Sequence, residues 1–432
     1  MHDLRHAPAP KSLPGGRRHW AVPIDIGSLA AKLTFDGAKH QVHGDATLDF
    51  HHGVEAGYPI FDLRQPITAA WLDKVPLKPG AIPLHRFGVK AEQSLRWVEK
   101  TLRPGDRHRL RLTYDLAAPP IKGSAKGGYL PDLNWGEGGR VNFNFGFTDL
   151  GGGRYLEAWA PANLIYDRFS LRLDVQIRHC LTPHALITNG EVEELERNHW
   201  RVRYPASFTS LSPMLQLHPV DAVESSTSQV VLPVSGRTIR LEAWKFRANP
   251  LGLDGQLKNI ALWMARNESA IGPYHHPDRF VAFMHRGGME YDGACTSAPD
   301  ALEHEVFHSW WARGLKPASQ NDGWIDEAWT VYHDDGGRVE KPFDFKEPPV
   351  RLCSRSPWNR ATPIESYRLG SRFFAGVAAR LGVERLQQIM REFYLLHAPG
   401  LITTGQLEAH ILDRANDDVI LRAFARWVYG RP

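Results

Sequence analysis

Hydrophobic and polar residues alternate in short runs through the first half of the chain. Clear runs cover residues 31–35, 109–113 and 171–175, and turns rich in glycine, proline and asparagine separate them. A period of two is typical of β-strands with one buried face. No long helical pattern interrupts these runs before about residue 235. The pattern therefore predicts an antiparallel, β-sandwich-like N-terminal domain over residues 21–235.

In the second half, the spacing of hydrophobic residues changes to a helical period. A strand at Thr238–Phe246 precedes an amphipathic helix at 257–269, and a further strand covers 280–284. Helices are also predicted over residues 300–313, 324–335, 364–381, 383–397, 405–415 and 418–429. Residues 225–240 are rich in serine, proline and glycine, which is typical of a linker, so we place the domain boundary there. We expect a mainly helical domain over 236–432. The fold class is α+β with two domains.

One predicted helix carries a metal-binding pattern, His-Glu-Val-Phe-His at residues 304–308. His304 and His308 share a helical face, with Cβ atoms about 5–6 Å apart. Two imidazoles at this spacing suit one zinc ion, and a catalytic zinc has three protein ligands and an open position. Glu327, after 18 intervening residues, supplies a carboxylate on a second predicted helix. Glu305 lies beside the histidines, where it can act as a general base toward water.

With 21 histidines in the chain, the pentapeptide by itself could arise by coincidence. Two observations argue against coincidence. Leu302, Val306 and Trp310 form a hydrophobic stripe that predicts a helix with the histidine pair beside it. Asp334 falls seven residues after Glu327 on the same face, where a carboxylate can orient a ligand histidine. We therefore expect a zinc enzyme with one Zn²⁺ per chain.

Composition narrows the class of protein without changing this picture. Hydrophobic content of 42% and charged content of 23% are ordinary for a globular protein, and 432 residues suit two domains. The formal net charge is only +4, so nucleic-acid binding is not expected. The basic alternation at 107–111 predicts one solvated strand face. Glycine clusters at 136–139 and 151–153 lack the Lys-Ser/Thr of a phosphate loop and are predicted as hairpin turns.

Three features bear on the compartment. Cys180, Cys295 and Cys353 form no Cys-x-x-Cys pair and no disulfide framework, which is typical of a reducing environment. Residues 1–20 lack the apolar segment of a signal peptide and are expected to be a disordered tail. No apolar run approaches the roughly 18 residues that span a bilayer. We expect a cytoplasmic protein without a membrane partner.

Three motifs stand in the order found in the gluzincin zinc aminopeptidases, the alanyl/leucyl aminopeptidase family that includes the leukotriene hydrolase. The 18 residues between His308 and Glu327 resemble that family's spacing, whereas thermolysin-type endopeptidases have one more. Gly-Gly-Met-Glu-Tyr at 287–291 is similar to the family's Gly-x-Met-Glu-Asn motif. Tyr-Arg-Leu-Gly at 367–370 is similar to its Tyr-x-x-Gly motif. The resemblance covers residues 237–432 well and implies a thermolysin-like catalytic domain there.

The resemblance also implies a role for each matching residue. The zinc ligands and the general base would be those named above. Glu290 would bind the free α-amino group of a peptide, and the backbone of Gly287 and Gly288 would align the scissile peptide as an added strand. Tyr367 would donate its hydroxyl to the oxyanion of the tetrahedral intermediate. Glu157 lies where the family's first domain contributes a second amine-binding group, with a surface strand position as the alternative.

We therefore expect a zinc aminopeptidase that cleaves the N-terminal peptide bond of short peptides with a free N-terminus. Tyr291 stands where the family has asparagine and is expected to narrow the first specificity pocket. The large C-terminal helical domain of many relatives is not present before Pro432. Two alternatives stay open: a zinc endopeptidase or other zinc hydrolase, and a catalytically degenerate binding or scaffold protein. The preferred first residue, the physiological substrate and the oligomeric state do not follow from the sequence.

Overall fold

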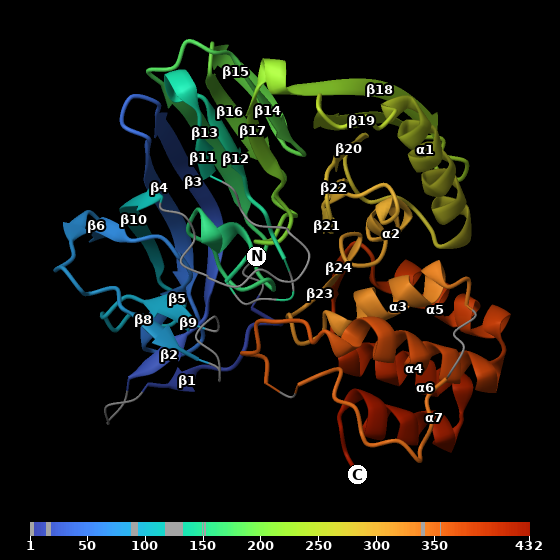
Figure 1. Ribbon diagram of the computed structural model, residues 1–432. Helices are drawn as coiled ribbons and strands as arrows, with labels where there is room; N and C mark the ends of the chain where they lie inside the picture. The colour runs from blue at the N-terminus through green and yellow to red at the C-terminus, as the bar shows by residue number, and fades with distance from the viewer. Residues whose placement is uncertain are drawn as a thin grey trace. The chain divides into compact units, whose positions relative to one another are not determined.

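The computed structural model describes residues 4–13, 19–87, 94–116, 133–148, 150, 153–337, 342–354 and 356–432. The chain divides into two compact units, Met1–Glu224 with Phe246–Ala248, and Ser225–Lys245 with Asn249–Pro432. The first unit is rich in strands and the second in helices (Figure 1). The division falls inside strand β18 (Val223–Val231). The domain boundary at residues 235/236 stays a prediction.

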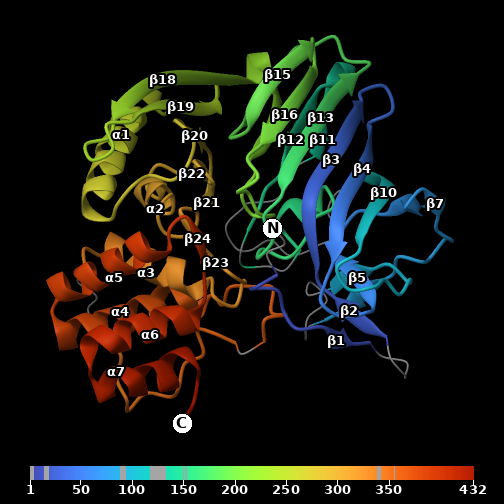
Figure 2. The same ribbon diagram turned by 180° about the vertical axis from the view of Figure 1, so that it is seen from behind.

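An eight-stranded sheet forms the centre of the first unit, in the order β15-β16-β13-β3-β4-β10-β6-β7. Its strands are β3 (Ile24–Asp36), β4 (Gln41–His52), β6 (Ile67–Leu72), β7 (Val75–Pro76), β10 (Arg107–Leu116), β13 (Ser170–Arg178), β15 (Glu191–Glu196) and β16 (His199–Tyr204). Burial alternates along β3, β4 and β13, as the sequence predicts. Figure 2 shows the long strands β3, β4 and β13 side by side.

One pairing in this sheet differs from the expected antiparallel arrangement. Strands β13 and β3 pair in parallel over Ser170–Arg178 and residues 28–36. Alternating hydrophobicity marks a strand but carries no information on the direction of its neighbour. A parallel pair needs a long connection, and here most of the intervening strands of the unit supply it. The expectation of a purely antiparallel domain is therefore wrong at this pairing.

Two smaller sheets complete the first unit. One contains β11 (Leu133–Trp135), β12 (Val141–Asn144), β17 (Leu215–Pro219) and β14 (His184–Thr188), and the other contains β1 (Lys11–Ser12), β2 (Trp20–Val22), β5 (Tyr58–Phe61), β9 (Ser94–Trp97) and β8 (Leu84–Arg86). Phe35 of β3 packs edge-on against Phe143 of β12, with ring centroids 5.2 Å apart, so side chains of the two sheets interdigitate. Strand β1 lies within the segment expected to be disordered and pairs with β2.

The glycine-rich segment after β11 forms a hairpin, as predicted. Strands β11 and β12 pair in antiparallel fashion, and the short helix η2 (Glu137–Gly139) connects them. Gly138 has a φ of 69°, which favours glycine. In the second predicted glycine turn, residues 151 and 152 lie outside the described part of the chain.

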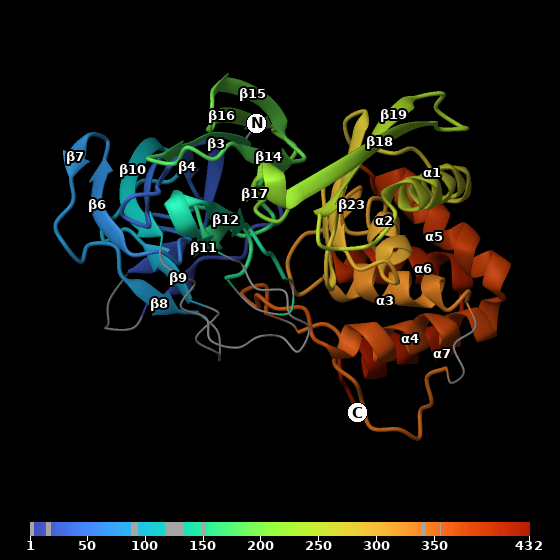
Figure 3. The same ribbon diagram turned by 45° about the horizontal axis from the view of Figure 1, so that its top comes forward.

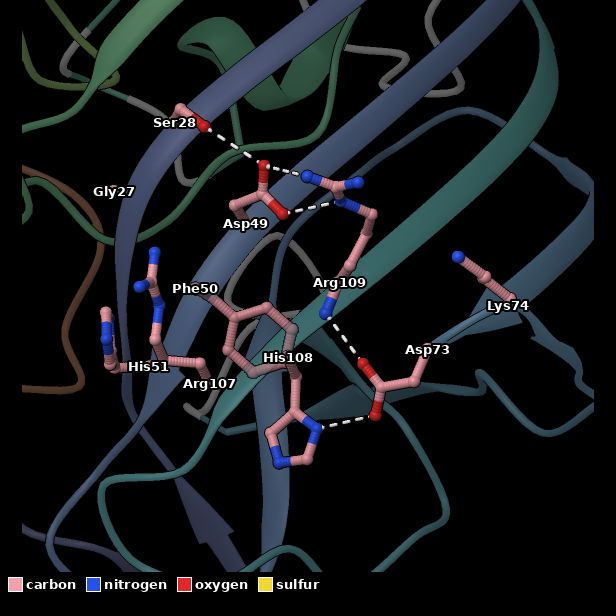
Figure 4. A pocket seen from close by; sticks show the side chains of 10 residues that line it. All are labelled: Gly27, Ser28, Asp49, Phe50, His51, Asp73, Lys74, Arg107, His108 and Arg109. Carbon is pink, nitrogen blue, oxygen red and sulfur yellow. Dashed lines mark hydrogen bonds and ion pairs between the residues drawn. The ribbon is translucent and has the colours of Figure 1, made fainter.

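The basic residues of β10 form a surface face of the first unit, beside a hollow of about 730 Å³ (Figure 4). Arg109 forms two hydrogen bonds with Asp49 of β4, at 2.7 and 3.0 Å. His108 bonds Asp73 at 2.7 Å. Carboxylates of neighbouring strands and turns therefore pair with Arg109 and His108 on this face.

The second unit contains a five-stranded sheet in the order β18-β19-β20-β22-β21. Besides β18 its strands are β19 (Thr238–Phe246), β20 (Arg279–Met284), β21 (Gly288–Tyr291) and β22 (Ala294–Ser297). Strands β19, β20 and β22 run parallel, and β21 pairs antiparallel to β22. Strand β21 therefore lies at one end of the strand order. A separate two-stranded sheet joins β23 (Leu315–Pro317) to β24 (Gly400–Ile402).

Seven α-helices of the described chain belong to this unit. They are α1 (Leu253–Ala270), α2 (Leu302–Phe307), α3 (Trp324–Asp334), α4 (Glu365–Leu381), α5 (Val383–His397), α6 (Thr404–Ala415) and α7 (Asp418–Ala423), which continues as the π-helix η5 (Phe424–Val428). Helices α3 to α7 gather together, and α1 contacts α2 (Figures 1 and 3). A single hydrophobic core runs through the unit. None of the described helices is long and apolar enough to cross a membrane.

Helix α2 is shorter than the helix predicted over residues 300–313. It ends at Phe307, and the Trp310 amide bonds the Phe307 carbonyl in a tighter turn. Ala312 has a φ of 104°, and a Cβ on Gly314 would lie 2.9 Å from the Trp310 carbonyl oxygen. The hydrophobic pattern did not show this end, because Trp310 and Trp311 are buried in a turn as they would be in a helix.

Candidate active site

The two histidines of the zinc motif face one another at the end of α2. Their Nε2 atoms lie 2.9 Å apart, and Glu327 Oε2 lies 3.5 Å from His304 Nε2 and 3.7 Å from His308 Nε2. Glu327 belongs to the first turn of α3, so two helices meet at this cluster. One donor atom from each residue lies within 4.8 Å of the others. The structure thus brings together the three residues that the sequence proposed as metal ligands.

Hydrogen bonds on the outer side of each imidazole determine which nitrogen faces the cluster. His308 Nδ1 donates to the Trp311 carbonyl oxygen at 2.9 Å. A carbonyl only accepts, so Nδ1 carries a hydrogen, and in the neutral imidazole that binds a metal Nε2 has the lone pair. His304 Nδ1 lies 2.6 Å from Asp334 Oδ2, and an ionised carboxylate imposes the same tautomer. The sequence prediction placed Asp334 in this neighbourhood, and the structure shows it in contact with a ligand histidine.

The donor set fits a zinc ion. Glu327 is 3% exposed, and its Oε2 has no hydrogen-bond partner among the described residues. A buried carboxylate oxygen in that state is costly unless a cation or a hydrogen bond compensates it. Two imidazole nitrogens and one carboxylate oxygen match the His₂Glu set of catalytic zinc sites. A cation among these three atoms would satisfy both lone pairs and the carboxylate.

Charge coupling within the cluster is strong. Burial raises the pKa of Glu327, but its interactions with the nearby imidazoles of His304 and His308 outweigh burial and hold the pKa of this carboxyl well below its usual range. Burial raises the pKa of Glu305 to about 8, and the Glu290 carboxylate contributes to the increase. A general base works best with a pKa near the operating pH, so the surroundings of Glu305 suit that role.

Glu305 lies between the histidine cluster and strand β21. Its Oε1 is so close to Gly288 that a Cβ built there would lie 1.9 Å from it. Glu290, Glu305 and His308 also offer atoms within 4.8 Å of one another. Gly287, just before β21, has a φ of 75°, a conformation that favours glycine. The predicted base and the predicted substrate-binding residues therefore occupy one site.

Tyr367 reaches the same cluster from the first turn of α4. Its hydroxyl donates to Glu327 Oε1 at 2.8 Å. Gly370 allows this approach, because a Cβ there would lie 2.5 Å from the Cβ of Ala328, so α4 packs directly on α3. The structure shows Tyr367 bonded to a predicted ligand, and its part in oxyanion binding stays a prediction.

Glu157 is located in the first unit, in the short helix η3 (Leu156–Ala158). It is fully buried, so the alternative of a surface strand residue is wrong. The signal in the sequence was ambiguous, because a single turn of 3₁₀-helix has no hydrophobic period of its own. Its role at the substrate amine stays a prediction.

Arg313 is a residue of this site that the sequence analysis missed. Its Nη2 donates to Glu290 Oε1 at 2.8 Å, and its Nε donates to the Glu290 carbonyl oxygen at 3.2 Å. Both side chains are buried, at 2% and 8% exposure. A charged residue within the apolar run from Trp310 to Leu315 was the available signal. No local pattern pairs it with a partner 23 positions earlier.

Comparisons with known proteins bear on the fold. No protein-family model matches the sequence, and no curated protein matches it. Among solved structures, the chain is similar to an M1 zinc metallopeptidase from Deinococcus radiodurans, a mutant bound to a Tyr-Ser-Ala substrate. The TM-score is 0.64 at 16% identity, and the match covers 95% of each chain.

Two longer proteins have a similar structure. Yeast LTA4 hydrolase in complex with bestatin matches with a TM-score of 0.63 at 14% identity, over 95% of this chain and 68% of that one. Legionella pneumophila aminopeptidase A in complex with aspartic acid matches with a TM-score of 0.67 at 13% identity, over 97% and 51%. The chain therefore has the fold of the M1 zinc metallopeptidases, a β-rich N-terminal part followed by a helical C-terminal part.

Proposed function

We propose that this protein is a zinc-dependent aminopeptidase that hydrolyses the first peptide bond of short peptides. The observation that carries the proposal is the convergence of His304, His308 and Glu327, with Glu305 placed between them and the edge strand that holds Glu290. The fold supports it, since solved neighbours include M1 zinc metallopeptidases bound to single amino acids and to a tripeptide substrate.

The residues divide the work of peptide hydrolysis among them. His304, His308 and Glu327 would hold a zinc ion, which would supply a Lewis acid for the substrate carbonyl and lower the pKa of a bound water to about 7. Glu305 accepts the proton of the attacking water and delivers it to the leaving amine. Its raised pKa makes Glu305 a better acceptor of that proton than an ordinary carboxylate.

Glu290 binds the α-amino group of the substrate. This carboxylate is buried and lies within the cluster that contains Glu305 and His308. An ammonium ion next to it forms a charge-assisted hydrogen bond in a site with little water. An acetylated N-terminus offers no such charge and leaves the carboxylate without that partner, so blocked peptides bind poorly. This preference makes the enzyme an exopeptidase.

The test is a panel of aminoacyl anilides and their N-acetylated twins, assayed with and without a chelator. We expect cleavage of the unblocked substrates, loss of cleavage on zinc removal, and recovery when zinc returns. Glu305→Gln should retain zinc and lose turnover. Glu303→Gln is a matched control, because Glu303 lies on the same helix, 39% exposed and paired with Arg266 outside the site.

Three results would contradict the proposal in different ways. Equal cleavage of acetylated substrates would remove the amine-binding role of Glu290. Internal cuts in a mixed peptide library would indicate the endopeptidase alternative. A freshly purified protein that holds no zinc and takes none up would favour the scaffold alternative.

A further inference from the structure

The edge of strand β21 determines how an extended peptide can pair with this site. The register with β22 pairs Gly288 with Ser297, and the Ala298 amide donates to the Gly287 carbonyl at 2.6 Å. Hydrogen-bonded positions alternate along an antiparallel pair. The main-chain groups of Gly288 and Glu290 therefore point away from β22, toward the outer edge of the sheet.

Of these two outward carbonyls, that of Glu290 is already capped. The Glu290 carbonyl accepts a hydrogen bond from Arg313 Nε, and Arg313 Nη2 holds Oε1 of the same residue. One guanidinium thus binds the main chain and the side chain of Glu290 together. Gly288 is exposed and lies against Glu305. A peptide that adds to this edge pairs with the main-chain groups of Gly288, next to Glu305. Two residues further along β21, at Glu290, it reaches the carbonyl that Arg313 caps.

The chemistry of arginine suits this double contact. Its planar guanidinium presents several N–H donors in a fixed fork, whereas lysine has one flexible ammonium. Because Arg313 and Glu290 are both buried, the guanidinium also restricts the carboxylate to one orientation. Its Nη2 donates to Oε1 of that carboxylate.

We propose that Arg313 sets the end of the substrate-binding edge, by capping β21 at Glu290 and holding the Glu290 carboxylate in position for the amino terminus of an extended peptide. The substrate class rests on the proposed function. An extended peptide then pairs with the main chain at Gly288, and its amino terminus stops at Glu290. Only the first residue of the peptide therefore lies between Glu290 and Glu305. Arg313 acts through Glu290 and is a positioning residue.

Binding to a protein that cannot turn over substrate tests this inference. The zinc-loaded Glu305→Gln protein is titrated calorimetrically with L-leucinamide and with N-acetyl-L-leucinamide. We expect the unblocked probe to bind at least about tenfold more tightly, because the acetylated one leaves Glu290 without an ammonium partner. Arg313→Lys and Arg313→Met, added to this background, should reduce the ratio to about threefold or less, mainly by weakening the unblocked probe.

A matched control is Arg372→Lys. Arg372 is 7% exposed and forms two hydrogen bonds with the half-buried Glu347, at 2.9 and 3.1 Å, so it is a buried arginine paired with a carboxylate elsewhere in the same unit. The ratio should not change in this variant. Zinc content and circular dichroism report the folding of every variant. If Arg313→Met does not fold, Arg313→Lys retains the charge and decides the question.

A second measurement uses the protein with Glu305 intact. Mass spectrometry of an unblocked hexapeptide should show single-residue release by the unmodified protein, and additional dipeptide release by Arg313→Met, because the edge beyond Glu290 is no longer capped. An unchanged binding ratio in folded, zinc-loaded Arg313 variants would overturn the role of Arg313 alone. No preference for the unblocked probe in the parent protein would overturn the amine-binding site itself, and this inference with it.

Discussion

Replacing Asp334 with asparagine isolates the contribution of the hydrogen bond behind a zinc-ligand histidine. Asp334 Oδ2 lies 2.6 Å from His304 Nδ1, and no other proposed ligand contacts this carboxylate. Asparagine keeps the size of the side chain and removes its charge. Its amide can also present an N–H to Nδ1, which stabilises the tautomer whose hydrogen is on Nε2, the nitrogen that faces the cluster.

The size of the effect follows from the environment of the bond. Loss of such an outer hydrogen bond typically costs 10- to 100-fold in metal affinity. His304 and Asp334 are 18% and 32% exposed, so solvent screens part of their attraction. We therefore expect a loss near the lower limit, about tenfold, which corresponds to about 1.4 kcal/mol.

The assay is competition for zinc between the protein and a chromophoric chelator at fixed pH. Asp335→Asn is the control, because Asp335 is the exposed residue immediately after Asp334, at the end of α3. It should bind zinc as the unmodified protein does. Equal zinc affinity of Asp334→Asn and the unmodified protein would refute the claim that this carboxylate orients His304.

Three further predictions concern packing, chemistry and pH. Gly370→Ala would bring a Cβ within 2.5 Å of that of Ala328. We expect a loss of about 1–3 kcal/mol in the free energy of unfolding, measured by urea denaturation. Unchanged stability would show that α4 can shift to make room. Tyr367→Phe should lower kcat about 10²- to 10³-fold if the hydroxyl binds the oxyanion, whereas a loss confined to zinc affinity would restrict it to its bond with Glu327. Burial lowers the pKa of His276 from 6.5 to about 4, so the unfolded chain binds more protons between these values. His276 should therefore cost no stability above pH 6.5 and up to about 3 kcal/mol as the pH falls to 4. In unfolding experiments, His276→Gln should reduce the dependence of the free energy of unfolding on pH in this range. An unchanged pH dependence would contradict the lowered pKa of His276.

Local patterns in the sequence predicted the elements that build the site. The helical spacing of His304 and His308 and the distance to Glu327 both depend on short-range geometry, and the structure brings these residues together. Asp334 follows from the same helical period. Strand and helix positions in both halves also follow from periods of two and 3.6, because burial on one face imposes them.

Features that depend on distant contacts could not be predicted in this way. The end of α2 depends on how Ala312 and Gly314 fold back against the tryptophan pair. The parallel pairing of β3 with β13 joins segments more than a hundred residues apart. The partner of Arg313 lies on a strand 23 residues earlier. Each is determined by tertiary packing, which a single sequence does not display.

The most direct test of the central claim is a crystal of the protein grown with zinc and measured at the zinc absorption edge. The account predicts one anomalous peak in the second unit, within about 2.0–2.2 Å of His304 Nε2, His308 Nε2 and a carboxylate oxygen of Glu327. A fully occupied zinc that binds elsewhere, or a cluster that stays empty in the presence of excess zinc, would contradict it.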